Sequence, residues 1–156
     1  MDDVYKDNFK QAIASSQKAL YSASVIALFV WILAKSEVLE EIKLPILGFS
    51  VEANFGVLVV MLLYTALGAQ LMYCLSIASK NLKMVESTDL RQALLLSPSV
   101  LNGSLAVRVT AVMAPFLILL SAMHTAFSGN WAAAFLVAIV YSTFHFIAAS
   151  YSYEIK

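Results

Sequence analysis

Among the polar side chains within long apolar stretches of this sequence, Gln70, Ser142 and His145 are the candidates for an intramembrane polar site. A polar side chain is costly in hydrocarbon, so such residues face other helices or a water-filled path. Gln70 follows Phe55 by about four helical turns, and His145 follows Trp131 by about four turns as well, which predicts similar depths in the inner half of a membrane. We expect the two to hydrogen-bond, within one chain or between chains, or to line a pore or gate.

The residue patterns of catalytic and metal sites are missing from these stretches. His124 is expected near the outer end of the third span, so it cannot share a metal ion with His145. No Asp or Glu is expected inside the membrane, where proton-coupled exporters and intramembrane aspartyl enzymes need one. No serine has a base and an orienting acid beside it. We therefore expect no enzyme activity, no metal and no cofactor.

Four apolar stretches must position these polar residues. Residues 55–79 contain no Asp, Glu, Lys, Arg or His, and at about 1.5 Å per residue this run is long enough to cross a bilayer. The other expected spans are residues 19–35, 105–127 and 131–153. Because these four spans use more than half of the 156 residues, the sequence predicts one integral membrane domain. Its predicted fold class is all-α, a four-transmembrane-helix bundle in the lipid bilayer.

Shorter elements connect the spans. Residues 1–18 are expected to form a cytoplasmic leader helix that continues into the first span. Residues 42–51, with Pro45 and Gly48, predict a short extracytoplasmic hairpin-like loop. Ser87 or Thr88 can cap a cytoplasmic amphipathic helix through Leu96, which lies along the membrane surface or docks under the bundle. The turn at residues 128–130 is so short that spans three and four are expected to be antiparallel neighbours.

The charges predict the topology and the outward contacts. Eight of the ten Lys and Arg residues lie on the side that holds both termini and the second loop, so the positive-inside rule places both termini in the cytoplasm. Four of these cations, Lys80, Lys83, Arg91 and Arg108, are candidates for contact with a cytosolic protein or with anionic lipid. The net charge is zero, so we expect no direct binding of nucleic acid.

Small residues along the fourth span predict close helix packing. Ala134, Ala138, Ser142 and His145 follow one stripe, and small residues four apart let helices approach closely in a membrane. A shorter stripe surrounds Gly68. Packing within one four-helix monomer accounts for one such stripe, whereas two stripes predict self-association as a homo-oligomer.

The layout resembles the KwaA family, the four-span membrane subunits of the bacterial Kiwa anti-phage system. The features that match are the cytoplasmic leader, the outer hairpin with LPILGFSV, the charged inner loop and the tight outer SGN turn. The resemblance implies a homo-oligomeric protein of the bacterial inner membrane that detects phage attack and works with a cytosolic partner. It transfers no catalytic or binding residue to this chain.

The leading hypothesis is therefore a membrane sensor or scaffold that recruits or regulates a cytosolic protein. One alternative is an ion channel or membrane-permeabilising effector in which Gln70, Ser142 and His145 face a central axis. A second alternative is a small transporter.

Overall fold

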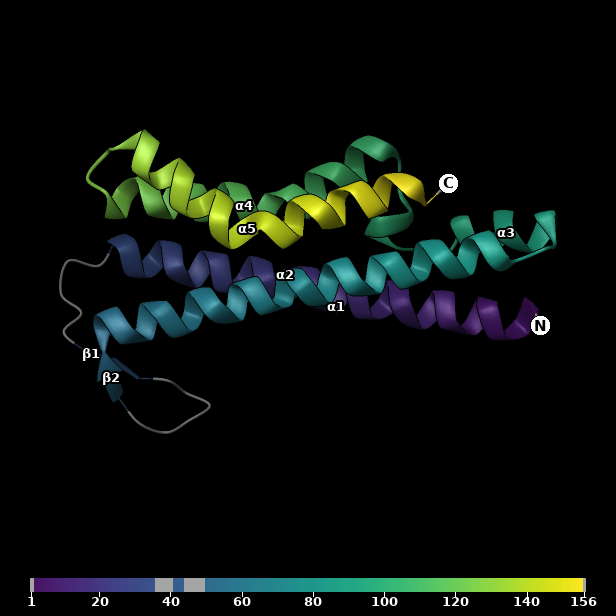
Figure 1. The fold of residues 1–156 in the computed structure, drawn as a ribbon, viewed down its shortest axis with the longest axis horizontal. Helices are drawn as coiled ribbons and strands as arrows, with labels where there is room; N and C mark the ends of the chain where they lie inside the picture. Colours follow the sequence, from purple (N-terminus) through teal and green to yellow (C-terminus); the bar gives the residue numbers. More distant parts are fainter. Residues whose placement is uncertain (1, 36–40, 44–49, 156) are drawn as a thin grey trace.

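Four long helices make up the bundle in the computed structural model, which describes residues 2–35, 41–43 and 50–155 (Figure 1). The long helices are α1 (Asp2–Lys35), α2 (Ala53–Met84), α4 (Leu105–Ala126) and α5 (Trp131–Glu154). Each is long and apolar enough to cross a membrane. The predicted four-span all-α bundle is confirmed, and the leader is continuous with the first span as one helix.

The four helices form a ring in which α1 packs on α2 and α4, and α5 also packs on α2 and α4. Because the chain crosses back and forth, α2 and α5 run in the same direction as neighbours, and so do α1 and α4. The C-termini of α2 and α5 therefore lie at one end of the bundle, together with the N-terminus of α1 (Figure 1). We call this the charged end, and it comprises residues 2–18, 79–108 and 152–155.

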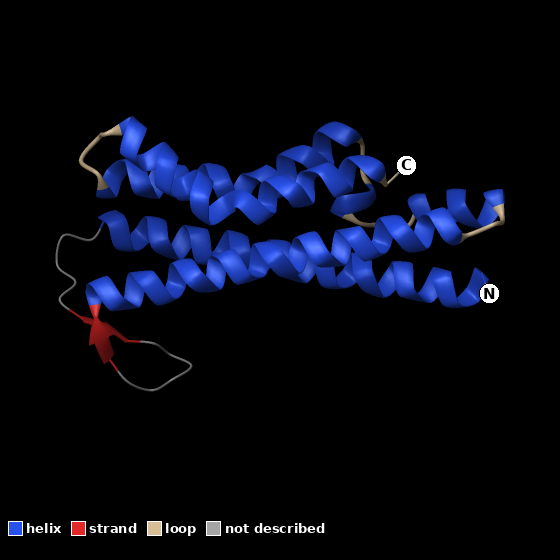
Figure 2. Ribbon diagram, viewed as in Figure 1, coloured by secondary structure: helices blue, strands red, loops and turns tan. Residues whose placement is uncertain are grey.

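The opposite end, the hairpin end, carries two short strands. Strands β1 (Glu41–Lys43) and β2 (Ser50–Glu52) pair antiparallel, with Ile42 opposite Val51, just before α2 (Figure 2). These paired strands confirm the hairpin-like loop, while its Pro45 and Gly48 lie outside the described residues.

A tight turn at the hairpin end joins α4 to α5, as predicted for antiparallel neighbours. Ser128 and Gly129 both have positive φ angles, 52° and 86°, and the Gly129 N–H donates to the carbonyl of His124 at 2.9 Å. The left-handed backbone conformation favours glycine and stops α4. Asn130 then caps α5, because its side-chain oxygen accepts a hydrogen bond from the Ala133 N–H.

At the charged end, α1 and α2 extend past the ends of α4 and α5 (Figure 1). These two helices contain 34 and 32 residues, and about 20 suffice to cross a membrane. The short helix α3 (Thr88–Leu95) docks on the extension, followed by the 3-10 turn η1 (Val100–Asn102). Ser87 caps α3 as predicted, and Leu94 of α3 packs in one apolar cluster with Phe9 and Leu82 of the extension.

Apolar side chains fill the interior in two clusters. One lies toward the charged end and includes Phe9, Leu82 and Leu94, so it joins α3 to the extension of α1 and α2. The other lies toward the hairpin end and includes Phe116 and Leu119 of α4. Burial of both clusters holds the four helices together and gives the extension an apolar core of its own.

Candidate functional site

A polar layer lies inside the bundle between the two apolar clusters. The hydroxyl groups of Tyr64 on α2 and Ser142 on α5 are 3.0 Å apart and share a hydrogen bond. The ring of Tyr64 stacks on His145, with centroids 4.6 Å apart and planes 19° from parallel. All three residues have no exposed surface. They therefore connect two parallel helices through groups that lipid does not reach.

Gly68 makes this arrangement possible. A β-carbon added at Gly68 would lie 2.6 Å from two ring atoms of His145 and 3.3 Å from Cβ of Phe144. Only glycine lets α2 come this close to the imidazole. Both ring nitrogens of His145 lack a hydrogen-bond partner among the described residues, so packing and stacking hold the ring in place.

The small-residue stripe of α5 faces the interior of the same chain. Ala134, Ala138 and Ser142 are fully buried against neighbouring helices. This stripe therefore serves the monomer, and it no longer supports the expectation of self-association. Close packing inside one chain and between two chains requires the same small residues, which is why the sequence pattern left both open.

Gln70 lies elsewhere than expected. It follows Gly68 by two residues, so it is at nearly the same depth as His145 but about 200° around the helix from Gly68. Its side chain is exposed on the outside of the bundle. Gln70 thus makes no contact with His145 within the chain, and the three polar side chains do not share one axis.

At the charged end, Arg108 holds the C-terminus of α5. Its guanidinium Nη1 donates to the carbonyl of Ser152 at 2.7 Å and also to the carbonyl of Ile155. The carbonyls in the last turn of a helix lack intrahelical partners and carry partial negative charge. Arg108 is only 7% exposed, so, contrary to expectation, it is unavailable to a partner protein or to lipid headgroups.

Arg91 likewise binds backbone carbonyls at the C-terminus of α2. Its Nη2 donates to the carbonyls of Val85 at 2.8 Å and Lys83 at 3.4 Å. On the other side of the α2–α3 connection, the Asp2 carboxylate accepts from the backbone N–H groups of Glu86 and Ser87, both at 3.2 Å. These contacts join α3 and the start of α1 to the end of α2.

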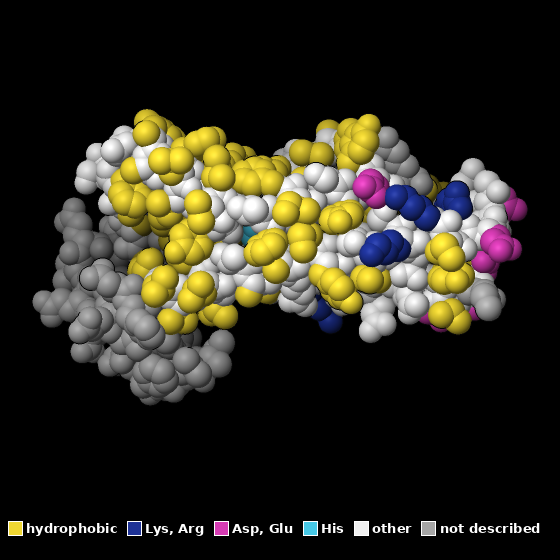
Figure 3. All heavy atoms as spheres, in the orientation of Figure 1, with side chains coloured by type: hydrophobic (Ala, Val, Ile, Leu, Met, Phe, Trp, Pro, Cys, Tyr) yellow, Lys and Arg dark blue, Asp and Glu magenta, His cyan; other side chains and the backbone are white. Residues whose placement is uncertain are grey.

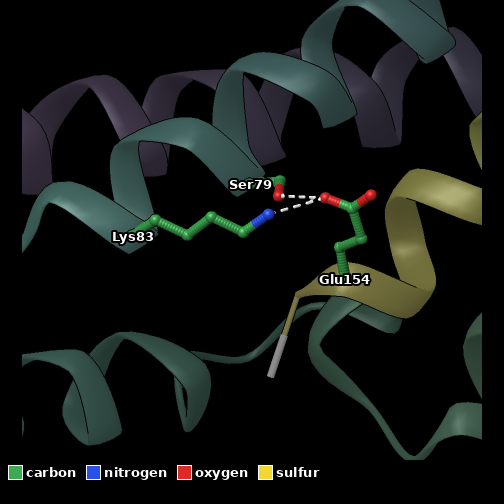
Figure 4. A network of polar contacts seen from close by, with 3 residues as sticks. All are labelled: Ser79, Lys83 and Glu154. Atoms are coloured by element: carbon green, nitrogen blue, oxygen red, sulfur yellow. Dashed lines mark hydrogen bonds and ion pairs between the residues drawn. The ribbon is translucent and has the colours of Figure 1, made fainter.

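Lys83 is also engaged within the chain. Its Nζ lies 2.8 Å from Glu154, which additionally accepts from the Ser79 hydroxyl at 3.1 Å (Figure 4). An acid in the last turn of a helix is unfavourable for the helix dipole, and Lys83 and Ser79 offset that cost. Because both charged side chains are substantially exposed, the pair contributes at most about 1 kcal/mol to stability.

Lys80 is the one of the four candidate cations that stays exposed with no hydrogen bond or ion pair among the described residues. It lies near the end of α2, at the charged end. Basic and acidic side chains gather at that end in Figure 3, whereas hydrophobic side chains are spread over the other described parts of the view. Lys80 is therefore the cation most accessible to a binding partner.

Tyr64, Asp2 and Glu154 take part in these arrangements although the sequence pattern did not single them out. Glu154 carried a usable signal, because an acid at a helix C-terminus calls for a nearby cation. Tyr64 and Asp2 carried none, since their partners depend on which helices are neighbours. Within the described residues, no group of three or more His, Cys, Asp or Glu side chains is arranged to hold a metal ion.

The fold and these sites define a multi-pass α-helical membrane protein with a closed four-helix bundle. Comparisons with models of protein families, with curated proteins and with solved structures give no match.

Proposed function

We propose that the chain is a scaffold or sensor of the bacterial inner membrane that recruits a cytosolic protein at its charged end, in anti-phage defence. The observation that carries the proposal is the extension of α1 and α2 beyond the spans, closed by α3. Crossing the membrane does not require this extension. It has its own apolar core and is joined to α3 through Asp2 and Arg91, so it offers a folded surface to the adjacent aqueous compartment.

The positive-inside rule supports a cytoplasmic location for the charged end, because most of the lysines and arginines lie there. The resemblance in layout to the KwaA family supports a role in phage defence with a cytosolic partner. A channel or permeabilising effector is less well supported, because Gln70 faces away from Ser142 and His145. Ion flux in liposomes, altered by His145→Leu, would favour the channel, and substrate-dependent uptake would favour a transporter.

Charge reversal at Lys80 tests the scaffold. We expect Lys80→Glu to abolish or strongly weaken recovery of a cytosolic protein that is crosslinked to the wild type in cells. Recovery should also fall as salt is raised during purification without crosslinking, because exposed charges are screened. Quantitative mass spectrometry of the crosslinked complexes measures both the identity and the amount of the partner.

The matched control is Lys35→Glu, which reverses an exposed lysine at the hairpin end, where Lys35 lies 4.1 Å from the centroid of Trp31. It should leave recovery unchanged. Equal recovery with wild type, Lys80→Glu and Lys35→Glu would refute recruitment through Lys80.

A further inference from the structure

Gln70 carries a primary amide on the outside of a membrane-spanning helix. It lies in the second half of α2, which begins at Ala53, and before Lys80. At about 1.5 Å per residue it is about 25 Å from the hairpin end and about 15 Å from Lys80. Gly68, two residues before Gln70, faces His145 of α5. The depth of Gln70 therefore corresponds to a part of α5 well before Glu154, the last residue of that helix. Gln70 thus lies within the membrane-spanning part of the bundle.

The amide of Gln70 has no hydrogen-bond partner among the described residues, unlike two threonine hydroxyl groups elsewhere in the spans. Thr143, which is also exposed, donates to the carbonyls of Ile139 and Val140 on its own helix. Thr65 likewise donates to the carbonyl of Met61. A glutamine amide has two donor hydrogens and an acceptor oxygen, and leaving them unpaired in hydrocarbon is unfavourable.

The surface around Gln70 is suited to a neighbouring helix. Ala66 lies one turn before Gln70 and is exposed, and Tyr73 lies about one turn after it and is 65% exposed. Leu62, 56% exposed, continues the same face toward the hairpin end. We call residues 62, 66, 70 and 73 the α2 face. A small residue beside a polar one permits both close approach and an interhelical hydrogen bond.

We propose that the α2 face binds a second copy of this chain, forming a two-fold symmetric dimer in which the two Gln70 amides hydrogen-bond to each other. Two copies inserted with the same topology place Gln70 at the same depth. A two-fold axis along the membrane normal then brings identical residues together. Because an amide both donates and accepts, Gln70 complements itself across this axis. Lys80 continues the face in the aqueous region, where water and salt screen the repulsion between the two lysines.

This inference goes beyond the proposed function, which specifies no oligomeric state, and it names a surface for the self-association predicted from the sequence. It also replaces the α5 stripe, whose Ala134 and Ala138 are buried within the chain.

Disulfide crosslinking in native membranes tests the dimer. Cys74 is the only cysteine of the chain, so Cys74→Ala gives a cysteine-free background. We expect Gln70→Cys to form an oxidant-induced dimer in that background, with Ala66→Cys and Tyr73→Cys also positive. The control is Ile147→Cys on α5, which is 39% exposed and lies at nearly the same depth as Gln70, just past the Gly68–His145 contact. It should remain monomeric.

A second measurement uses the wild-type cysteine and reports affinity. Energy transfer between labelled copies in liposomes should show a dissociation constant about 3- to 10-fold higher for Gln70→Leu than for wild type. Gln70→Asn keeps the amide and should lie closer to wild type.

Either of two results would overturn the inference. One is Ile147→Cys forming the crosslinked dimer as efficiently as Gln70→Cys, and the other is Gln70→Leu self-associating as tightly as the wild type. In either case the chain self-associates through another surface, and the proposed function stands. Monomers under every condition would remove both the dimer and the self-association predicted from the sequence. Partner recruitment through Lys80 is measured separately and is unaffected by that outcome.

Discussion

Gly68→Leu is expected to leave little folded protein, and Gly68→Ala to lower the free energy of unfolding by about 1 to 3 kcal/mol. Even one added carbon would lie 2.6 Å from the His145 ring. The ring has little freedom to retreat, because Tyr64 stacks on its face and the site is fully buried. Reversible unfolding in mixed detergent micelles, followed by circular dichroism, measures the change.

The control for Gly68→Ala is the same substitution in a His145→Ala background. Removing the imidazole removes the clash, and alanine is favoured over glycine within a helix by about 1 kcal/mol. Gly68→Ala should therefore become neutral or stabilising in that background. An equal cost in both backgrounds would show that contact with His145 is not what requires glycine.

Arg108→Leu is expected to lower the free energy of unfolding by about 1.5 to 3 kcal/mol, the range for loss of a hydrogen bond from a charged donor. The carbonyls of Ser152 and Ile155 would lose their donor at a buried helix end. The loss should be local as well as global, with faster amide hydrogen exchange in the last turn of α5. Unfolding curves and hydrogen exchange followed by mass spectrometry measure the two effects.

Arg91→Leu provides the comparison for Arg108→Leu. Arg91 binds carbonyls near the end of α2, so its loss should speed exchange around α3 and leave the end of α5 protected. If Arg108→Leu unfolded like the wild type, the guanidinium would have no structural role and would again be a candidate for external contacts.

The spans and α3 were predictable because their signals are local. The uncharged run at residues 55–79 can hardly avoid forming a membrane helix, and Ser87 followed by Asp89 is typical of a helix start. The antiparallel pairing of α4 and α5 followed from the short turn between them. None of these predictions requires knowledge of distant neighbours.

The partners of the polar residues were not predictable, because they depend on the order of helices around the ring. Only when α2 and α5 are parallel neighbours does Tyr64 meet Ser142, and Lys83 meet Glu154. The same neighbour relation turns Gln70 outward and the α5 stripe inward. A single sequence gives the helical periodicity of each face but not the helix that covers it.

Accessibility of a cysteine at position 80 tests the central claim most directly, because the proposed scaffold requires the charged end to face the cytosol. In the Cys74→Ala background, Lys80→Cys should resist a membrane-impermeant maleimide in intact cells whose outer membrane admits the reagent. It should react once the inner membrane is permeabilised. Labelling of Lys80→Cys in intact cells would place the charged end outside the cytosol, and recruitment of a cytosolic partner there would be ruled out.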